Sequence, residues 1–258
     1  FFTLFIQINN MKTKIESYAQ YLDQQYRLGN ALISDSAFNH LEKNLIKTKS
    51  KFNYFTNETK CLPNLPKGNY KLFLNTLLKK TRLSIEPKIS GCTVAIEYIN
   101  GKINKAISKN GKEVTDKILE IKNIPQILPI DRNFQVRGEL YENGQTPLKS
   151  KINVNQFINK DGFYIKKLNF CGFQILNGRL NQYETLNYLK KCGFSTPHCY
   201  FTNFTSKVEF FRKEWLAGNV FSDYPTNGIV IKINSRKLQL LREKNSSFSS
   251  EWQFAIEE

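Results

Sequence analysis

The feature that most constrains this fold is a pair of apolar stretches on either side of Asn100-Gly101. Before this dipeptide, Val94, Ile96 and Tyr98 recur at every second position. After it, apolar residues continue as far as Ile107. A period of two is typical of a strand with one buried face, and Asn-Gly favours a two-residue turn between antiparallel strands. These residues are therefore predicted to form a β-hairpin.

Further strands and helices follow the hairpin. Strands are predicted at Phe134–Tyr141 and Gly228–Asn234, with another around Cys171. Helices are predicted over 181–194, where a glycine near the end provides a C-cap, and over 207–216. Antiparallel strands with interspersed helices predict an α+β fold.

The N-terminal part has a different pattern. Apolar residues from Ile15 onward recur at helical spacing, and Ser34 is a suitable N-cap for a second amphipathic helix. Residues 50–70 are polar and contain Pro and Gly, as connecting segments do. We therefore expect a small helical unit with its linker over residues 1–65 and a larger domain over residues 66–258.

Charge and cysteine content narrow the function. The net charge is +16, which favours contact with nucleic-acid phosphates, although a lysine-rich chain can also reflect an AT-rich genome. Five cysteines without a CxxC pair and only two histidines give no obvious zinc site, so no metal ligands are predicted. The apolar opening, FFTLFIQI, is too short to span a membrane. We expect a cytoplasmic monomer without a membrane segment.

Lys88 is the candidate reactive residue. A lysine just before a small-residue turn is most often a solvated charge, but here Glu86 precedes it and Gly91 follows. A second lysine, Lys232, lies inside an apolar strand. The alternating isoleucines of that strand place Lys232 on the opposite face, and a buried cation there needs an anionic partner.

Several motifs in sequence order resemble the NAD-dependent DNA ligases. The segments EPKISG, VRGE, NGIVIKI and WQFAIE are similar to four motifs of that family's adenylation core. AISKNG with the following VTDKILEIKNIPQIL is similar to a further stretch, and YRLGNALISDSAFNHL resembles the family's small helical domain. The resemblance covers roughly residues 15–257. It implies an antiparallel nucleotidyltransferase core of the ATP-grasp-like ligase type, preceded by a helical subdomain that recognises nicotinamide mononucleotide.

The resemblance also implies a chemistry. In the family, a lysine attacks the α-phosphorus of NAD, forms lysyl-AMP, and passes AMP to the 5′-phosphate of nicked double-stranded DNA in replication and repair. The lysine must be uncharged to attack, and cations, including Mg²⁺, stabilise the phosphorus as negative charge develops. By resemblance, the residues involved are the nucleophile Lys88, the second cation Lys232, the ribose-binding Glu139, the adenine-binding Glu86, the turn residues Ser90 and Gly91, and the nicotinamide-mononucleotide contacts Tyr26 and Asp35.

Departures from the family pattern fall on polar residues. Ser90 and Asn227 stand where the family has aspartates, and Glu257 stands where it has a lysine. Ser108 replaces an arginine, beside Lys109. Among the nicotinamide-mononucleotide positions, Phe38 and Asn39 also differ.

Three interpretations stay open. The first is a ligase adenylation module whose activity is intact or reduced. Without the family's downstream DNA-binding modules, such a chain is expected to grip a nick poorly. The second is a non-catalytic, basic nucleotide- or DNA-binding descendant. The third is a nucleotidyltransferase that uses ATP or acts on RNA.

Overall fold

The computed structural model describes residues 69–130, 133–176, 178–244 and 252–257, together with scattered positions before residue 69. The chain divides into two compact units, one of residues 1–60 with 110–112 and one of residues 61–109 with 113–258. The second unit holds the elements around Lys88 and Lys232. Most of the two predicted N-terminal helices, including Tyr26, Asp35, Phe38 and Asn39, lies outside the described residues.

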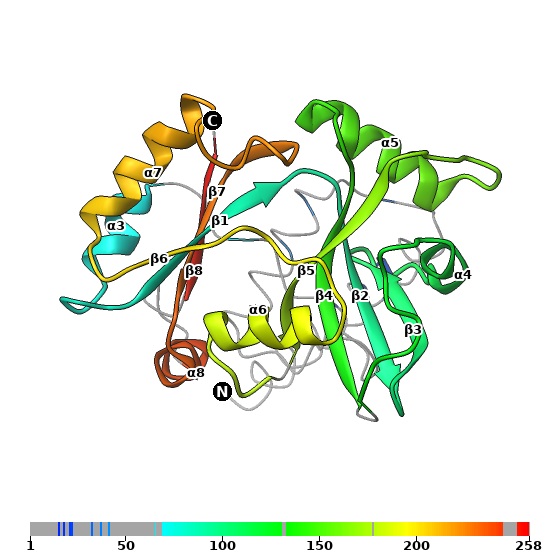
Figure 1. The fold of residues 1–258 in the computed structure, drawn as a ribbon, viewed down its shortest axis with the longest axis horizontal. Helices are drawn as coiled ribbons and strands as arrows, with labels where there is room; N and C mark the ends of the chain where they lie inside the picture. Colours follow the sequence, from blue (N-terminus) through cyan, green and yellow to red (C-terminus); the bar gives the residue numbers. More distant parts are fainter. Residues whose placement is uncertain are drawn as a thin grey trace, which may run out of the picture. The chain divides into compact units, whose positions relative to one another are not determined.

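The first sheet contains the two candidate lysines. Its strands are β1 (Leu83–Ile89), β6 (Tyr200–Thr202), β7 (Thr226–Ile233) and β8 (Gln253–Glu257). They are hydrogen-bonded in the order β6-β1-β7-β8, and each neighbouring pair is antiparallel (Figure 1). We call this sheet A.

The second sheet, sheet B, contains the predicted hairpin. Its strands are β2 (Cys92–Ile99), β3 (Lys102–Ser108), β4 (Phe134–Glu142) and β5 (Leu168–Leu176). Their order is β3-β2-β4-β5, and all neighbours are again antiparallel. Asn100 and Gly101 have φ values of 49° and 71°, as a two-residue type I′ turn requires. The hairpin and the antiparallel α+β organisation are confirmed.

Six helices accompany the sheets among the described residues from position 69 onward. They are α3 (Tyr70–Asn75), α4 (Thr115–Leu119), α5 (Pro147–Asn159), α6 (Gln182–Lys191), α7 (Ser206–Leu216) and α8 (Arg236–Lys244). The predicted helices correspond to α6 and α7. Asn181 and Glu184 form a capping box at the start of α6, and Gly193, with a φ of +91°, follows its end.

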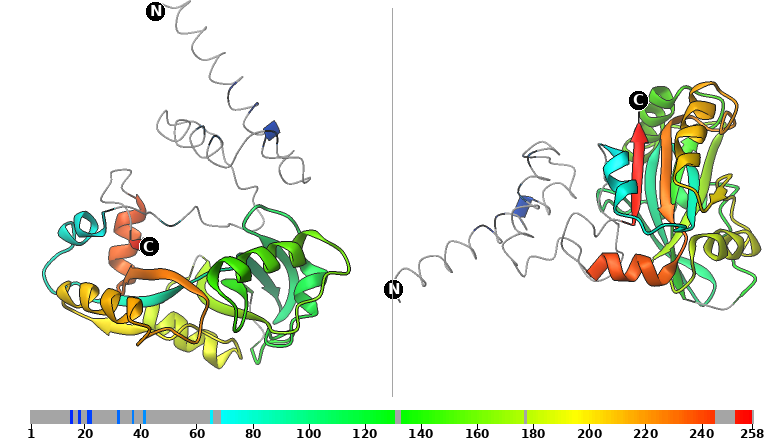
Figure 2. Two further views of the ribbon diagram at one scale, coloured as in Figure 1. Left: turned by 90° about the horizontal axis from the view of Figure 1, so that it is seen from above. Right: turned by 90° about the vertical axis from the view of Figure 1, so that its left-hand side faces the viewer.

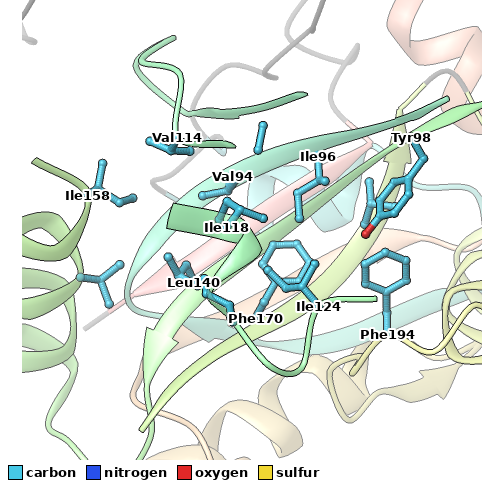
Figure 3. Close-up of a cluster of buried hydrophobic side chains, with 14 of the residues drawn as sticks. Val94, Ile96, Tyr98, Val114, Ile118, Ile124, Leu140, Ile158, Phe170 and Phe194 are labelled. Atoms are coloured by element: carbon cyan, nitrogen blue, oxygen red, sulfur yellow. The ribbon is translucent and has the colours of Figure 1, made fainter. Parts of the chain in front are cut away.

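Each sheet has an apolar core on one face. In sheet A, Leu83, Ile85 and the isoleucines of β7 pack in one cluster with residues of α3 and α7. Helix α7 packs on β7 and α3 packs on β8 (Figure 2). In sheet B, Val94, Ile96 and Tyr98 are part of a second cluster that includes Phe170 and Phe194 (Figure 3). The residues that alternate with these apolar side chains therefore point to the other face of each sheet.

None of the helices in the described ranges combines the length and the apolar character needed to cross a membrane.

Candidate active site

The face of sheet A opposite its apolar core carries polar side chains of β1. Ser84 and Glu86 alternate with Leu83 and Ile85, which pack on the helices, and Lys88 follows where the register with β7 shifts. Lys232, on the neighbouring strand β7, lies directly across from Ser84 in the register. The predicted facing of Lys232 is therefore confirmed, because the neighbouring isoleucines of β7 point into the apolar core.

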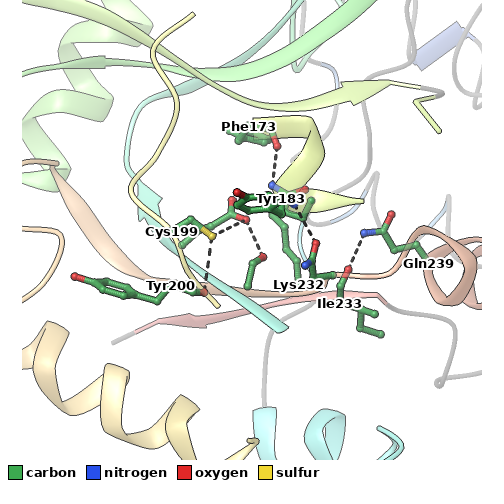
Figure 4. A network of polar contacts seen from close by, with 11 residues as sticks. Phe173, Tyr183, Cys199, Tyr200, Lys232, Ile233 and Gln239 are labelled. Carbon is green, nitrogen blue, oxygen red and sulfur yellow. Dashed lines mark hydrogen bonds and ion pairs between the residues drawn. The ribbon is translucent and has the colours of Figure 1, made fainter. Parts of the chain in front are cut away.

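Lys232 has the anionic partner that its burial requires. Its Nζ atom lies 2.6 Å from Oε2 of Glu86, and the two side chains are only 5% and 2% exposed. The Ser84 hydroxyl donates a hydrogen bond of 2.9 Å to Oε1 of the same carboxylate. The Lys232 ammonium also lies 5.0 Å from the centre of the Phe173 ring (Figure 4). Lys232 thus contacts a carboxylate and an aromatic face at once.

Lys88 has a different set of partners. Its Nζ atom lies 2.7 Å from Oε1 of Glu257, on β8, and donates a hydrogen bond of 2.9 Å to Oδ1 of Asn227, on β7. The Lys88 and Glu257 side chains are 19% and 25% exposed. Both partners occupy positions where the sequence departs from the ligase pattern. Glu257, which stands where the ligase pattern has a lysine, therefore lies beside the Lys88 amine.

Glu139 approaches from sheet B. It lies on β4 and accepts a hydrogen bond of 2.8 Å from the Thr93 hydroxyl. Burial of the carboxylate raises the pKa of Glu139, and the positive charges of Lys88, Arg137 and Lys109 oppose that rise. The interaction with Lys88 brings the candidate nucleophile and the candidate ribose ligand to one region.

Lys109 is the cation that follows Ser108, the residue that stands where the ligase pattern has an arginine. Its pKa is lowered, chiefly by burial, while the Glu139 carboxylate acts in the opposite direction. Lys109 follows β3, and its backbone N–H donates to the carbonyl of Thr93. A positive charge is thus present near Glu139 although Ser108 replaces the family's arginine.

The turn after Lys88 leaves no room for a side chain at position 91, which is a glycine. The Ser90 N–H donates to the carbonyl of Pro225, and the Ser90 carbonyl accepts a hydrogen bond of 2.7 Å from Ser150. A Cβ atom on Gly91 would lie 1.9 Å from the carbonyl oxygen of Leu140. Glycine is required because the chain crosses here from sheet A to sheet B against the backbone of β4.

Phe173 and Arg137 belong to the site but were not among the predicted site residues. The Arg137 guanidinium carbon lies 5.9 Å from the centre of the Phe173 ring, and Arg137 is only 6% exposed. In the pairing of β4 with β5, Arg137 pairs with Gln174, and the next residue of β4, Gly138, pairs with Gly172. Phe173 is thus the extra residue of a β-bulge, which aims its ring toward the two cations. Simple alternation along the predicted strand cannot assign the direction of such a residue.

A cavity of about 550 Å³ borders the partner of Lys88. It is formed by residues of α3, α7 and β8, namely Tyr70, Lys71, Glu209, Arg212, Ala255, Ile256 and Glu257. Within the described ranges, no group of three His, Cys, Asp or Glu side chains is placed to hold a metal ion.

Comparisons with known proteins identify relatives of the chain. The family model of the NAD-dependent DNA ligase adenylation domain matches residues 69–172. The DNA ligase of Ehrlichia ruminantium (strain Welgevonden) is 28% identical over 86% of this chain, which spans 33% of that protein. The DNA ligase of Petrotoga mobilis (strain DSM 10674 / SJ95) is 24% identical over 96% of this chain, which spans 46% of that protein. The chain thus spans less than half the length of these two relatives.

A solved structure supports the fold. The structure named "Pmar-Lig_Pre." gives a TM-score of 0.51 at 12% identity and covers 89% of this chain and 52% of its own. At this identity the likeness shows the fold alone, and the predicted nucleotidyltransferase fold is confirmed. Residues 69–172 therefore resemble the NAD-dependent DNA ligase adenylation domain, and the two DNA ligases match most of the chain at modest identity.

Proposed function

We propose that the chain is a ligase-type adenylation module in which Lys88 receives AMP from NAD. One observation carries this proposal: Lys88 and Lys232 lie on the same face of sheet A, and the charge of Lys88 acts on Glu139 from sheet B. Lysines on opposite sides of the molecule would have excluded shared chemistry at one phosphorus. The family match covers Lys88 and Glu139.

The proposed first step forms a bond between nitrogen and phosphorus. The Lys88 ammonium first loses a proton to solvent, and the neutral amine then attacks the α-phosphorus of NAD. The bond from this phosphorus to the bridging oxygen breaks, nicotinamide mononucleotide leaves, and the second amine proton is released. Lys232 and Arg137 are placed to offset the negative charge that develops nearby.

The next steps return the amine to its starting state. The 5′-phosphate of a DNA nick attacks the adenylate, so that AMP moves to DNA and the bond to Lys88 breaks. The 3′-hydroxyl then displaces AMP and closes the nick. NAD, Mg²⁺ and nicked double-stranded DNA are the proposed cofactors and partner, and the N-terminal unit, with Tyr26 and Asp35, is the proposed site for nicotinamide mononucleotide.

The decisive experiment is adduct formation. The full chain is incubated with Mg²⁺ and NAD labelled in its adenylate, and the denatured protein is then examined by gel and by intact mass. We expect one AMP on the wild type and on Lys79→Ala, an exposed lysine that serves as the control, and none on Lys88→Ala. Label from ATP but not from NAD would favour the ATP-using interpretation. No adduct from either nucleotide would favour the non-catalytic, basic binding module.

A further inference from the structure

The contacts of Lys88 are unusual for an amine that has to attack. A protonated lysine offers three N–H donors, and here two acceptors lie within hydrogen-bond distance, the Glu257 carboxylate and the Asn227 amide oxygen. The lone pair needed for attack exists only after a proton has left the nitrogen. The Glu257 carboxylate lies 2.7 Å from the amine, so it occupies the nitrogen and places a negative charge beside it.

The position of Glu257 is set by the backbone of β8. Glu257 pairs with Gly228 in the β7–β8 register, and a Cβ atom on Gly228 would lie 2.1 Å from the carbonyl oxygen of Ile256. The two strands are therefore in close contact at this point. Ile256 packs in the apolar core, so its neighbour Glu257 points to the opposite face, toward Lys88.

We propose that Glu257 masks the Lys88 nucleophile by holding the amine in an ion pair and by placing an anion where an incoming phosphate has to bind. The consequence for reactivity rests on the proposed function, because it matters only if Lys88 is the attacking amine. Glu257 then acts as a positioning residue with an inhibitory effect. Adenylation requires that its contact with Lys88 be broken first.

The other charges around Lys88 do not produce the same effect. Glu139 approaches from β4, but it is bonded to Thr93 and is shared with Arg137 and Lys109. Glu86, two residues earlier on β1, is neutralised by Lys232. Glu257, on β8, is the carboxylate in direct contact with Lys88 among the described residues. The accessibility of the Lys88 amine to a reagent should therefore depend most strongly on Glu257.

The masking can be measured without any nucleotide. Lys88 in the full chain is acetylated with trace acetic anhydride, a neutral reagent, between pH 6 and pH 11, and its labelling is quantified by peptide mass spectrometry against Lys79. Glu257→Gln keeps the shape of the side chain and removes its charge. We expect the midpoint pH of Lys88 labelling to fall by about half a unit, which is about a threefold gain in labelling at a fixed pH below the midpoint.

A matched control separates masking from general changes at the cavity. Glu209 lines the same cavity as Glu257, but it is bonded to Tyr70 and Arg212 rather than to Lys88. Glu209→Gln should leave the midpoint for Lys88 unchanged, whereas Glu257→Gln should lower it. Equal midpoints for the wild type and Glu257→Gln, or equal shifts in both variants, would overturn the proposal.

A second measurement keeps this inference separate from the proposed function. The same variants are tested for AMP transfer from NAD across the same pH range. A lower labelling midpoint in Glu257→Gln supports masking even if no variant forms an adduct, and then only the adenylation proposal fails. Conversely, if wild type and Glu257→Gln form adducts with the same pH profile and show equal labelling midpoints, adenylation stands and masking is wrong.

Discussion

Two lysine–glutamate pairs lie on the same face of sheet A, and they differ in burial. Lys232 and Glu86 are 2.6 Å apart and almost fully buried, with Ser84 and Phe173 as further contacts. Lys88 and Glu257 are 2.7 Å apart, but about a fifth to a quarter of each side chain is exposed. The two distances are nearly equal, so distance does not distinguish the pairs. Burial does distinguish them, because it determines how unfavourable each ion becomes when its partner is removed.

The buried pair behaves as part of the scaffold. If one partner is removed, the other charge is left in a low-dielectric environment, which is strongly unfavourable. The partly exposed pair has water as an alternative partner for both ions, so opening it is easy. One lysine is therefore held in place, whereas the other can be released for chemistry.

The largest expected effect is on the buried pair. Glu86→Gln leaves the Lys232 ammonium without its carboxylate and should lower the free energy of unfolding by about 3–5 kcal/mol. The measurement is urea unfolding at pH 7.5, followed by circular dichroism. The double variant Glu86→Gln/Lys232→Met removes both charges and should be less destabilised than Glu86→Gln alone. A loss below about 1 kcal/mol in the single variant would mean that the pair is not a structural unit. The Lys232–Glu86 and Lys88–Glu257 pairs would then not differ in their contribution to stability.

The pairing of Lys232 with a carboxylate was predictable only in part. The alternation of isoleucines around Lys232 already indicates that the lysine faces away from the apolar core and needs an anion. The identity of that anion depends on the pairing of β1 with β7, and Glu86 is 146 residues away in sequence. Nothing local in either strand determines this register.

Other features show the same division between local and long-range information. The turn at Asn100-Gly101 and the cap at Gly193 follow from backbone preferences of single residues. Helix α5 was missed, although Thr146 caps it and Pro147 occupies its first position, so its signals were present in the sequence. Phe173 had no such signal, because its direction arises from a register shift between two paired strands.

The second-largest expected effect is that of Gly228→Ala on stability, and this variant tests whether the position of β8 holds Glu257 next to Lys88. Gly228→Ala places a methyl group against the backbone of Ile256, so β8 has to move away from β7. We expect a loss of about 1–3 kcal/mol in the free energy of unfolding, together with easier acetylation of Lys88 at neutral pH. Gly172→Ala is the matched control, because its Cβ would be no closer than 3.4 Å to any neighbour. If Gly228→Ala unfolds at the same urea concentration as the wild type, the strand contact is too loose to position Glu257.

A smaller effect is expected from Glu139, the acid that sheet B contributes. Because burial raises the pKa of Glu139 in the folded state, the unfolded chain loses this proton more readily than the folded chain does. The folded wild type therefore loses stability as the pH rises from below the unfolded value toward the folded one. Below that window the carboxyl is protonated in both states and contributes nothing to the difference.

Glu139→Gln removes this titration. Its free energy of unfolding should rise relative to that of the wild type between pH 4 and pH 8, so the variant becomes relatively more stable. Urea unfolding of both proteins at the two pH values measures this change. A wild type that instead gains stability over Glu139→Gln as the pH rises would show that Lys88, Arg137 and Lys109 outweigh the burial of the carboxylate.

The smallest expected effect is on the stability of the exposed pair. Glu257→Gln should change the free energy of unfolding by less than about 1 kcal/mol at low salt, and by less still in 0.5 M NaCl, since ions screen partly exposed charges. Urea unfolding at both salt concentrations provides the measurement, with Glu86→Gln as the reference for a structural pair. The same substitution should nevertheless produce the larger shift in Lys88 labelling. If Glu257→Gln destabilised the fold as much as Glu86→Gln does, Glu257 would be a structural partner of Lys88 rather than a group that can release it.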